Sequence, residues 1–451
     1  MNASAVPQAA APGVEFDGAL IRKMSLSVPR YTSYPTADRF GDSFGYRDYL
    51  QAVAGQRTRG AARPLSLYLH VPFCESVCYY CACNKVVTKN RAKAATYLGY
   101  LKREIEMQGR LFAGMNHVGQ LHLGGGTPTY LSDDQMGDLM AHVRHWFQLA
   151  PDAEGEYSIE IDPRTVSPQR VHSLRNQGFN RISLGVQDFD PDVQRAVNRV
   201  QPEDATRDII SAARSAGFRS VSVDLIYGLP KQNVISMAQT LSRVIAAAPD
   251  RIAVYNYAHL PHLFKPQRRI LDADMPSADV RLDMLGLCIR RLADAGYAYI
   301  GMDHFARPGD DLAVAQQQGR LHRNFQGYST HAEADLVACG VSAISSVAAT
   351  YSQNAKTLEA YYDALDKNEL PVVRGVRLSM DDALRRTVIH TLMCNFELSV
   401  QAFEQAYPIE FGSYFATELE RLKALAADGL LSVGPDWLTV TPKGRLLIRN
   451  I

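Results

Sequence analysis

The chain has 451 residues, of which 46% are hydrophobic and 21% are charged, the ordinary composition of a folded protein with more than one domain. It carries 48 Lys and Arg against 47 Asp and Glu, and the formal net charge of +1 argues against nucleic-acid binding through bulk charge. No apolar run approaches the roughly 18 residues of a membrane span, and the first residues lack a secretory signal. Seven cysteines without a pairing pattern predict a reducing, cytoplasmic location.

The N-terminal segment divides into two parts. Residues 1–25 are rich in Ala and Pro and predict a loosely held arm. Residues 28–40 contain large or rigid residues without a helical period, namely Arg30, Tyr31, Tyr34 and Pro35. They predict either a linker packed on the surface or a strap that closes over a site, where Arg30 could pair with a carboxylate.

Six short apolar runs alternate with longer helical stretches after residue 60. The predicted strands are residues 65–71, 118–124, 157–162, 180–186, 219–226 and 252–257. Residues 92–113 and 233–248 are among the helical stretches between them. Strand and helix repeated six times imply parallel strands with right-handed crossovers, fewer than the eight of a closed barrel. We predict an α/β fold, a partial open (βα)6 barrel with its active residues at the carboxyl ends of the strands.

Three thiols follow the first of these strands. Cys74, Cys78 and Cys81 have C-x3-C-x2-C spacing on a loop, and compact cysteine loops hold iron–sulfur clusters. Three protein ligands leave a fourth iron open to bind a substrate. A structural zinc or a redox disulfide is the alternative, although no second cysteine or histidine pair completes a zinc site. Cys83 lies too close to Cys81 for a second ligand of one metal.

Polar and flexible residues follow the other predicted strands. Gly124, Gly125 and Gly126 precede Thr127, a run that allows a backbone to approach a ligand but also suits a simple tight turn. Carboxylates on the strands need a cation or donor when buried, which a ligand or a structural salt bridge could supply. The residues concerned are Glu160, Asp162, Asp224 and the potential partner Arg199.

The C-terminal part changes character from about residue 371. Residues 380–396 and 411–428 look helical, and residues 430–440 predict a hairpin, so this part resembles a winged helix. Its role is more plausibly a lid or cap than DNA binding, because the net charge is near zero. We therefore expect three parts: an arm and strap (1–60), a catalytic barrel with a substrate-binding extension (61–370) and a helical, winged-helix-like cap (371–451).

Several strings together resemble oxygen-independent coproporphyrinogen III oxidases, a family of radical S-adenosylmethionine (SAM) enzymes. The cysteine spacing is the signature of the superfamily, and the likeness runs from about residue 28 to residue 451. The strings are PRYTSYPT (29–36), YLHVPFC (68–74), CACNK (81–85), GGGTPTY (124–130), GVQDF (185–189), DLIYGLP (224–230) and RNFQGY (323–328). Related haem chaperones, the alternative function, usually lack the cysteine at the position of Cys83 and the N-terminal string. Family members usually continue with a cysteine-containing tail, and its absence after Ile451 leads us to expect an effect on activity.

The resemblance implies both cofactors and a reaction. A [4Fe–4S] cluster on Cys74, Cys78 and Cys81 reduces SAM, of which one or two molecules are bound per chain, to methionine and a 5′-deoxyadenosyl radical. The radical takes a hydrogen from a propionate of coproporphyrinogen III, and loss of CO2 and an electron leaves a vinyl group. Two such steps give protoporphyrinogen IX. The implied partners are a flavodoxin-like or ferredoxin-like electron donor and an external electron acceptor, and we expect a monomer without nucleic acid or membrane.

The resemblance also implies the residues at the site. Tyr68 and Glu160 have catalytic counterparts, although core packing is the default for Tyr68. The residues expected at SAM are Tyr68, Tyr80, Gly125, Gly126, Thr127, Glu160, Gln187, Arg199, Asp224, Ala258 and Ile344. Phe325, Gln326 and Ile344 resemble positions at the substrate and the second SAM. Arg307, Arg320 and Arg323 could serve a polycarboxylate substrate or be solvated loop residues.

Overall fold

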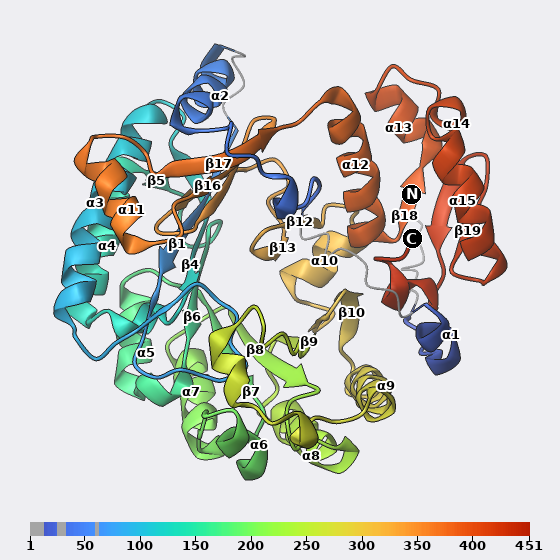
Figure 1. The fold of residues 1–451 in the computed structure, drawn as a ribbon, viewed down its shortest axis with the longest axis horizontal. Helices are drawn as coiled ribbons and strands as arrows, with labels where there is room; N and C mark the ends of the chain where they lie inside the picture. Colours follow the sequence, from blue (N-terminus) through green and yellow to red (C-terminus); the bar gives the residue numbers. More distant parts are fainter. Residues whose placement is uncertain (1–12, 25–32, 59–62) are drawn as a thin grey trace, which may run out of the picture. The chain divides into compact units, whose positions relative to one another are not determined.

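The computed structural model describes residues 13–24, 33–58 and 63–451, which divide into two compact units (Figure 1). The barrel unit consists of residues 35–284 and 331–383. The C-terminal unit consists of the described residues up to Tyr34 together with residues 285–330 and 384–451. Within the described ranges, no helix has both the length and the apolar character needed to cross a membrane.

The barrel unit is built on six neighbouring parallel strands. They are β1 (Leu65–Val71), β4 (His117–Gly125), β6 (Glu156–Ile161), β7 (Arg181–Gln187), β8 (Ser220–Tyr227) and β9 (Arg251–Asn256). Their order in the sheet is β9-β8-β7-β6-β4-β1, the order that successive right-handed crossovers produce. Each strand overlaps one predicted from the sequence. No strand pair closes the sheet within the described residues of this unit, so the prediction of a partial barrel is confirmed.

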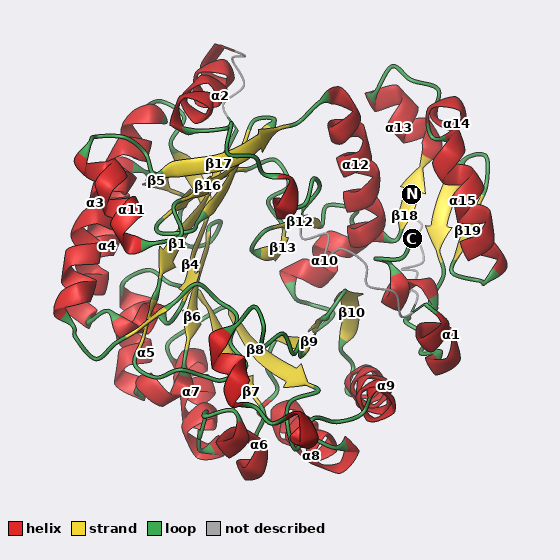
Figure 2. Cartoon of the chain, in the orientation of Figure 1, coloured by secondary structure: helices red, strands yellow, loops and turns green. Residues whose placement is uncertain are grey.

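Helices flank the outer side of this sheet (Figure 2). They are α3 (Ala92–Leu111), α4 (Asp133–Trp146), α5 (Pro168–Asn176), α6 (Pro191–Ala196), α7 (Glu203–Ser215) and α8 (Val234–Ala247). Strand β1 shows why a parallel sheet forms here. Leu65, Leu67, Leu69 and Val71 on one face are at most 1% exposed, and Ser66 on the other face is only 2% exposed. A strand buried on both faces needs cover on both sides, which the crossover helices help to supply.

The sheet continues beyond β1 with four strands that the sequence analysis did not predict. Strand β14 (Asp335–Cys339) is parallel to β1, and β15 (Ile344–Val347), β16 (Thr350–Asn354) and β17 (Val372–Arg377) follow in antiparallel order. Helices α2 (Tyr46–Thr58) and α11 (Leu358–Asp366) belong to the same unit. The short strand β5 (Gln148–Leu149) pairs with β4.

A buried carboxyl group fastens these extra strands to the barrel. Glu104 of α3 is fully buried and accepts hydrogen bonds from Tyr361 Oη at 2.6 Å, Gly340 N at 2.7 Å and Asn354 Nδ2 at 2.7 Å. Burial raises the pKa of Glu104 to about 7 in spite of these three donors. The carboxyl group therefore links α3 to the turn after β14, to β16 and to α11.

The C-terminal unit combines short strands with helices. Its elements are α1 (Gly18–Lys23), β10 (Ala298–Gly301), β11 (His304–Ala306), α10 (Asp311–Gln317), β12 (His322–Asn324), β13 (Gly327–Ser329), β18 (Glu397–Ser399), α13 (Val400–Ala406), α14 (Phe411–Tyr414), α15 (Ala416–Ala427), β19 (Leu431–Val433) and β20 (Trp437–Val440). Helix α9 (Ala278–Asp294) and helix α12 (Met380–Asn395) enter it from the other unit. The predicted helices and hairpin of the winged-helix-like part are confirmed, with β18 as a third strand of the sheet β18-β20-β19.

The N-terminal segment differs from its prediction. Residues 18–23 form α1 rather than part of a loose arm, with Asp17 capping the helix through Leu20 N at 3.0 Å. Leu20 and Ile21 of α1 pack against a buried cluster that includes Leu430, and this tertiary contact is not visible in the local sequence. Of the predicted strap residues, Arg30 and Tyr31 lie outside the described residues.

Candidate active site

The cysteine loop is anchored where strand β1 ends. Directly after Pro72, β2 (Phe73–Cys74) pairs in parallel with β3 (Val86–Val87), so the intervening residues form a closed loop. Two backbone hydrogen bonds hold its base, from Val86 N to Pro72 O at 2.7 Å and from Thr88 N to Cys74 O at 3.0 Å. The loop that carries Cys78 and Cys81 is therefore fixed at the carboxyl end of a buried strand.

The glycine run packs directly against this loop. Gly126 N donates to Val71 O at 2.8 Å, and Thr127 N donates to Phe73 O at 2.8 Å. A Cβ on Gly126 would lie 2.6 Å from Pro72 O, and a Cβ on Gly125 would lie 2.7 Å from the His70 ring. Gly125 also has a φ of +122°, which L side chains rarely adopt. Both positions require glycine because the two loops approach each other closely.

The carboxyl ends of the parallel strands open onto one cavity of about 520 Å³. Most of the predicted site residues line it: Cys74, Cys78, Tyr80, Cys81, Gly125, Gly126, Thr127, Glu160, Gln187, Arg199 and Asp224. They come from positions far apart in the sequence, and the parallel sheet brings them together. Tyr68, Ala258 and Ile344 are predicted site residues that are not in the cavity lining.

The three thiols have different neighbours in the cavity. Cys74 Sγ lies 3.5 Å from Thr127 Oγ1. Cys78 Sγ accepts from Arg199 Nη1 at 3.5 Å and from Arg164 Nη2 at 3.6 Å. A hydrogen bond from the Cys83 thiol lowers the pKa of Cys81 to about 6, while burial raises the pKa of Cys74 to about 11.

These thiols fit an iron–sulfur cluster by their donor chemistry. Clusters are held by thiolates, and cations beside a thiol favour the thiolate form. The ammonium group of Lys85, which donates to Cys81 O at 3.0 Å, supplies such a cation, and two guanidinium groups contact the Cys78 sulfur. Among the described residues, no three His, Cys, Asp or Glu side chains are grouped so that they could hold a single metal ion. All seven cysteines are free thiols.

Glu160 connects the glycine run to a row of aromatic side chains. Its Oε2 accepts from Gly125 N at 3.1 Å, and its Oε1 lies 3.3 Å from His122 Nε2. Burial raises the pKa of Glu160, but the hydrogen bonds from His122 and Gly125 outweigh it and hold the pKa below its ordinary value. Glu160 is therefore an anion at neutral pH, next to the backbone of the glycine run.

Tyr68 lies behind this row rather than in the cavity lining. Its ring stacks on the His122 ring at 5.8 Å between centroids, and its Oη lies 3.1 Å from His70 Nδ1. His70 Nε2 lies 3.1 Å from Asn84 O, at the end of the cysteine loop. Burial lowers the pKa of His70 and raises that of Tyr68, so both are neutral near pH 7.

A second carboxylate of the cavity lining is paired with two arginines. Asp162 lies 2.6 Å from Arg164 Nη2 and 3.2 Å from Arg199 Nη1, and its side chain is only 10% exposed. Burial raises the pKa of Asp162, but the two guanidinium groups hold it below its ordinary value. The same two arginines contact Cys78, so this ion pair connects β6 to the cysteine loop.

Asp224 is the least compensated acid of the cavity. It accepts a hydrogen bond from Ser183 Oγ at 3.2 Å. Burial and the neighbouring negative charge of Glu160 raise the pKa of Asp224 to about 7. Two neighbouring carboxyl groups of the cavity therefore differ in charge, since Glu160 is ionised and Asp224 titrates near neutrality.

The sequence analysis missed two residues that position the cysteine loop. Gln267 is 1% exposed, and its Nε2 donates to Tyr80 O at 3.0 Å and to Ala258 O at 3.2 Å. Gln267 therefore joins the cysteine loop to the segment that follows β9. The sequence does not mark Gln267, because it does not lie directly after a strand. Arg164 follows β6 directly, and the rule that selected Glu160 and Asp162 could have found it.

The predicted substrate residues belong to different units. Ile344 begins β15 in the barrel unit. Phe325 and Gln326 form the turn between β12 and β13 in the C-terminal unit, which also contains the three arginines predicted for a polycarboxylate, Arg307, Arg320 and Arg323. Arg323 is buried, whereas Arg307 and Arg320 are exposed.

Comparisons with known proteins agree with this architecture. The Radical SAM superfamily matches residues 68–244, and the HemN C-terminal domain matches residues 378–447. The chain is 51% identical to the oxygen-independent coproporphyrinogen III oxidase of Pseudomonas aeruginosa over 97% of this chain and 95% of the relative. It is 52% identical to the enzyme of that name from Escherichia coli over 97% and 94%. A solved structure described as coproporphyrinogen III oxidase from Escherichia coli, a radical SAM enzyme, has a TM-score of 0.92 at 50% identity, covering 97% of this chain and 98% of that one.

Proposed function

The chain belongs to the oxygen-independent coproporphyrinogen III oxidase family, and on that premise we propose that it converts two propionates of coproporphyrinogen III to vinyl groups. Each conversion removes one hydrogen atom, one CO2 and one electron from the side chain, and the product is protoporphyrinogen IX. The observation that carries the proposal is the cavity itself. Three thiols, a glycine run and the carboxyl groups of neighbouring strands line it together.

The cofactors of a radical SAM enzyme are a [4Fe–4S] cluster and SAM, which together supply one-electron chemistry and hydrogen-atom abstraction from an unactivated carbon. We propose Cys74, Cys78 and Cys81 as the cluster ligands. The residues proposed to bind SAM are Tyr68, Tyr80, Gly125, Gly126, Thr127, Glu160, Gln187, Arg199, Asp224, Ala258 and Ile344. The exposed position of Ala258 and the placement of Tyr68 behind the cavity lining make their contributions indirect or dependent on the bound ligand.

The residues that line the cavity suit a ligand that carries both positive charge and a carboxylate. Ionised Glu160 lies beside the glycine backbone, where an ammonium group can pair with it. Asp224 accepts or releases a proton near neutral pH and can therefore match its charge to the ligand. Arg199 is held by Asp162 and Gly185 O and can face a carboxylate without moving. Tyr68 and His70 are neutral groups that hold the wall behind Glu160 and exclude water.

The decisive experiment is anaerobic reconstitution of the purified protein with iron and sulfide, followed by addition of SAM, a reductant, an electron acceptor and coproporphyrinogen III. We expect monovinyl and then divinyl porphyrinogen products, with methionine formed from SAM. SAM cleavage without a porphyrinogen product would reject the substrate. Tight haem binding without turnover would instead support the haem-chaperone alternative, a name that none of the relatives described above carries.

We also propose the setting in which this reaction occurs. A flavodoxin-like or ferredoxin-like donor supplies electrons to the cluster, and an external acceptor takes the electron left by each decarboxylation. The protein works as a monomer in the cytoplasm, without nucleic acid or membrane. Seven unpaired cysteines in the described residues support a reducing compartment. The division at residues 60 and 370 into arm, catalytic barrel and cap is part of the same proposal.

A further inference from the structure

A buried arginine of the C-terminal unit forms no ion pair with any residue that the structure describes. Arg323 of strand β12 is 6% exposed, and its Nε and Nη1 atoms have no hydrogen-bond partner among the described residues. Its guanidinium group lies over the Tyr328 ring at 4.6 Å from the centroid. A cation–π contact of this kind compensates only part of the cost of burying a charge.

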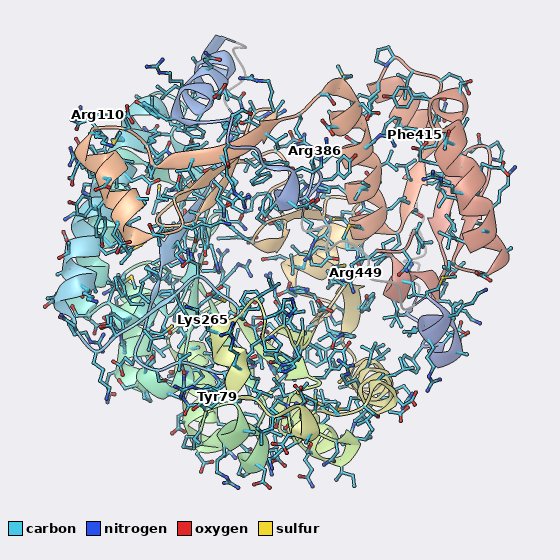
Figure 3. The ribbon with its side chains drawn as sticks, in the orientation of Figure 1. Tyr79, Arg110, Lys265, Arg386, Phe415 and Arg449 are labelled. Atoms are coloured by element: carbon cyan, nitrogen blue, oxygen red, sulfur yellow. The ribbon has the colours of Figure 1, made fainter. Side chains whose placement is uncertain are left out.

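Further polar groups gather around the same point. The rings of His322, also on β12, and His390 on α12 meet at 5.1 Å between centroids. His390 Nε2 is buried without a hydrogen-bond partner in the described part of the chain. Arg386, one helical turn before His390 and labelled in Figure 3, adds a second guanidinium group whose charge acts on both histidines. Burial lowers the pKa of His322 to about 4 and that of His390 well below its ordinary value, so both imidazoles are neutral at pH 7.

The cations of this cluster form no ion pair with a described acid, although the charge of Asp303 acts on the neighbouring Tyr328. Within the described residues, no carboxylate forms an ion pair with Arg323, Arg386, His322 or His390. The residue next to Arg386 behaves differently, since Arg385 Nη1 pairs with Glu418 Oε1 at 2.7 Å. Neighbouring arginines of one helix therefore differ, since Arg385 pairs with Glu418 and Arg386 pairs with no carboxylate in the described ranges. Buried charges are normally paired, so the buried Arg323 is the member that indicates a ligand counter-charge, and the half-buried Arg386 lies beside it.

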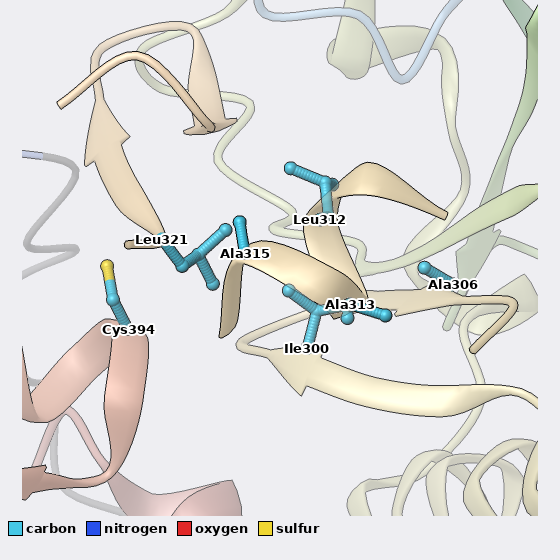
Figure 4. Close-up of a cluster of buried hydrophobic side chains, with 7 residues drawn as sticks. All are labelled: Ile300, Ala306, Leu312, Ala313, Ala315, Leu321 and Cys394. Carbon is cyan, nitrogen blue, oxygen red and sulfur yellow. The ribbon is translucent and has the colours of Figure 1, made fainter. Parts of the chain in front are cut away.

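An apolar cluster holds the elements that carry these charged groups in place. Leu321, directly before β12, and Cys394, near the end of α12, belong to one buried apolar cluster with Ile300 and Leu312 (Figure 4). Tyr328 packs against the same cluster, and its Oη donates to Met393 O at 3.4 Å. Strand β12 and helix α12 are thus joined by this apolar cluster and by the hydrogen bond from Tyr328 to Met393. Such a frame can present two guanidinium groups and two neutral imidazoles with little loss of entropy on binding.

We propose that Arg323 and Arg386, with His322 and His390 beside them, form a binding site for a carboxylate of the tetrapyrrole, one that is retained rather than lost as CO2. A carboxylate matches the planar fork of a guanidinium group and can accept further hydrogen bonds from a neutral imidazole. The site would therefore orient the macrocycle, so these are positioning residues. The assignment rests on the proposed function for the identity of the ligand, but the unpaired cations are a property of the chain itself.

The test is the affinity for coproporphyrin III, the stable oxidised tetrapyrrole, measured anaerobically on the cluster-loaded protein by fluorescence quenching. We expect Arg323→Gln and Arg386→Gln each to weaken binding about 10- to 100-fold, the range for hydrogen bonds to charged groups. Arg385→Gln is the matched control, with the same charge change on the same helix, and should stay within about twofold. The methyl ester of coproporphyrin should bind wild type weakly and should not distinguish the variants.

Two outcomes overturn the proposal: equal affinities of wild type, Arg323→Gln and Arg386→Gln, or no measurable binding to wild type. A thermal-unfolding measurement excludes a merely structural effect. Because Arg323 is buried without an anion, Arg323→Met should keep or raise the Tm of the ligand-free protein while losing the ligand-induced increase in Tm. A lower Tm together with unchanged ligand affinity would also overturn the proposal.

The two proposals can fail separately. If wild type binds coproporphyrin III through these arginines but forms no vinyl product, the proposed function fails and the carboxylate site stands. If wild type forms the products and the arginine variants keep the wild-type KM and affinity, the carboxylate site fails and the function stands.

Discussion

The cavity of the barrel unit and the cationic cluster of the C-terminal unit differ in how their arginines are paired, although Arg386 of the cluster is half-buried rather than buried. In the cavity, Arg164 and Arg199 share Asp162 and also contact the Cys78 sulfur. In the cluster, Arg323 and Arg386 have no ion-pair partner among the described residues. The first arrangement is complete without a ligand and fixes the position of a loop. The second arrangement lacks an anion among the described residues. The unpaired charge destabilises the ligand-free protein, and a bound ligand would offset that loss by supplying the anion.

This contrast distinguishes arginines that support the structure from arginines that can bind an anion. A guanidinium group that is already paired has lost much of its capacity to attract another anion, but it has gained a fixed orientation. An unpaired one keeps its electrostatic attraction and destabilises the empty protein. In the barrel unit, pairing therefore fixes the cysteine loop and holds Arg199 in one orientation toward a ligand, whereas the unpaired Arg323 keeps its full charge for recognition. The predictions below test this difference, beginning with the largest effect.

The largest effect should come from the thiols that the paired arginines support. Replacing Cys78 by Ser should abolish the brown absorbance of the reconstituted cluster and all SAM cleavage, because two thiolates cannot replace three. The same result is expected for Cys74→Ser and Cys81→Ser. Cys83→Ser is the matched control and should keep the cluster, because the serine hydroxyl can still donate the hydrogen bond that lowers the pKa of Cys81. Loss of the absorbance in Cys83→Ser would show that the ligand assignment is wrong.

The second effect compares the two kinds of arginine directly. Arg199→Met should lower the stability of the protein by about 3–5 kcal/mol, since it leaves the buried Asp162 with only one of its two cations. Arg323→Met should not destabilise the protein. Thermal unfolding of both variants without added ligand measures the difference. Arg195→Gln, which removes an exposed ion pair with Asp192, is the control and should cost less than about 1 kcal/mol. Equal losses for Arg199→Met and Arg323→Met would break the comparison between the two regions.

A smaller effect concerns the anion beside the glycine run. Glu160→Gln removes the negative charge while keeping the size of the side chain, so it should weaken SAM binding about 10- to 100-fold. Anaerobic titration calorimetry with SAM on the cluster-loaded protein measures it. Glu154→Gln, at an exposed position just before β6, is the control and should remain within about twofold. Unchanged SAM affinity in Glu160→Gln would remove Glu160 from the proposed binding residues.

The six barrel strands could be predicted because each is a short apolar run with a helical stretch after it. Strands β14, β15 and β16 could not, because each carries buried polar residues, such as Gln353 and Asn354 of β16. These residues are satisfied by tertiary partners, as Asn354 is by Glu104 from α3. Helix α1 was missed for a similar reason, since its apolar residues pack against a cluster around Leu430, more than 400 positions away in the sequence.

The candidate site shows the same limit. Cys74, Glu160 and Asp224 could be selected from the sequence because each lies in or just after a predicted strand of a parallel sheet. Gln267 could not, because its role depends on two backbone carbonyl groups, those of Tyr80 and Ala258. The sequence also placed Arg323 among three candidate cations without distinguishing them. Only the packing of β12 against α12 shows that Arg323 is buried and lacks an anion.

The smallest effect concerns the proton on Asp224. Its carboxyl group has a pKa of about 7 in the ligand-free protein, so it is mostly protonated below pH 7 and ionised above it. A cationic ligand favours the ionised form, and below pH 7 binding must first remove the proton, at up to about 1.4 kcal/mol per pH unit. SAM affinity should therefore fall up to about tenfold from pH 7 to pH 6, with proton release on binding.

Calorimetry in two buffers of different ionisation enthalpy measures the released proton and the affinity together. Asp224→Asn has no proton to lose at this position, so its affinity should be nearly independent of pH over the same range and its binding should release fewer protons. The paired acid Asp162 provides the contrast, because its pKa lies below the ordinary value and it stays ionised from pH 6 to 7. Parallel pH profiles for wild type and Asp224→Asn would mean that Asp224 does not face the ligand. The adjustable charge of the cavity would then have to come from another group.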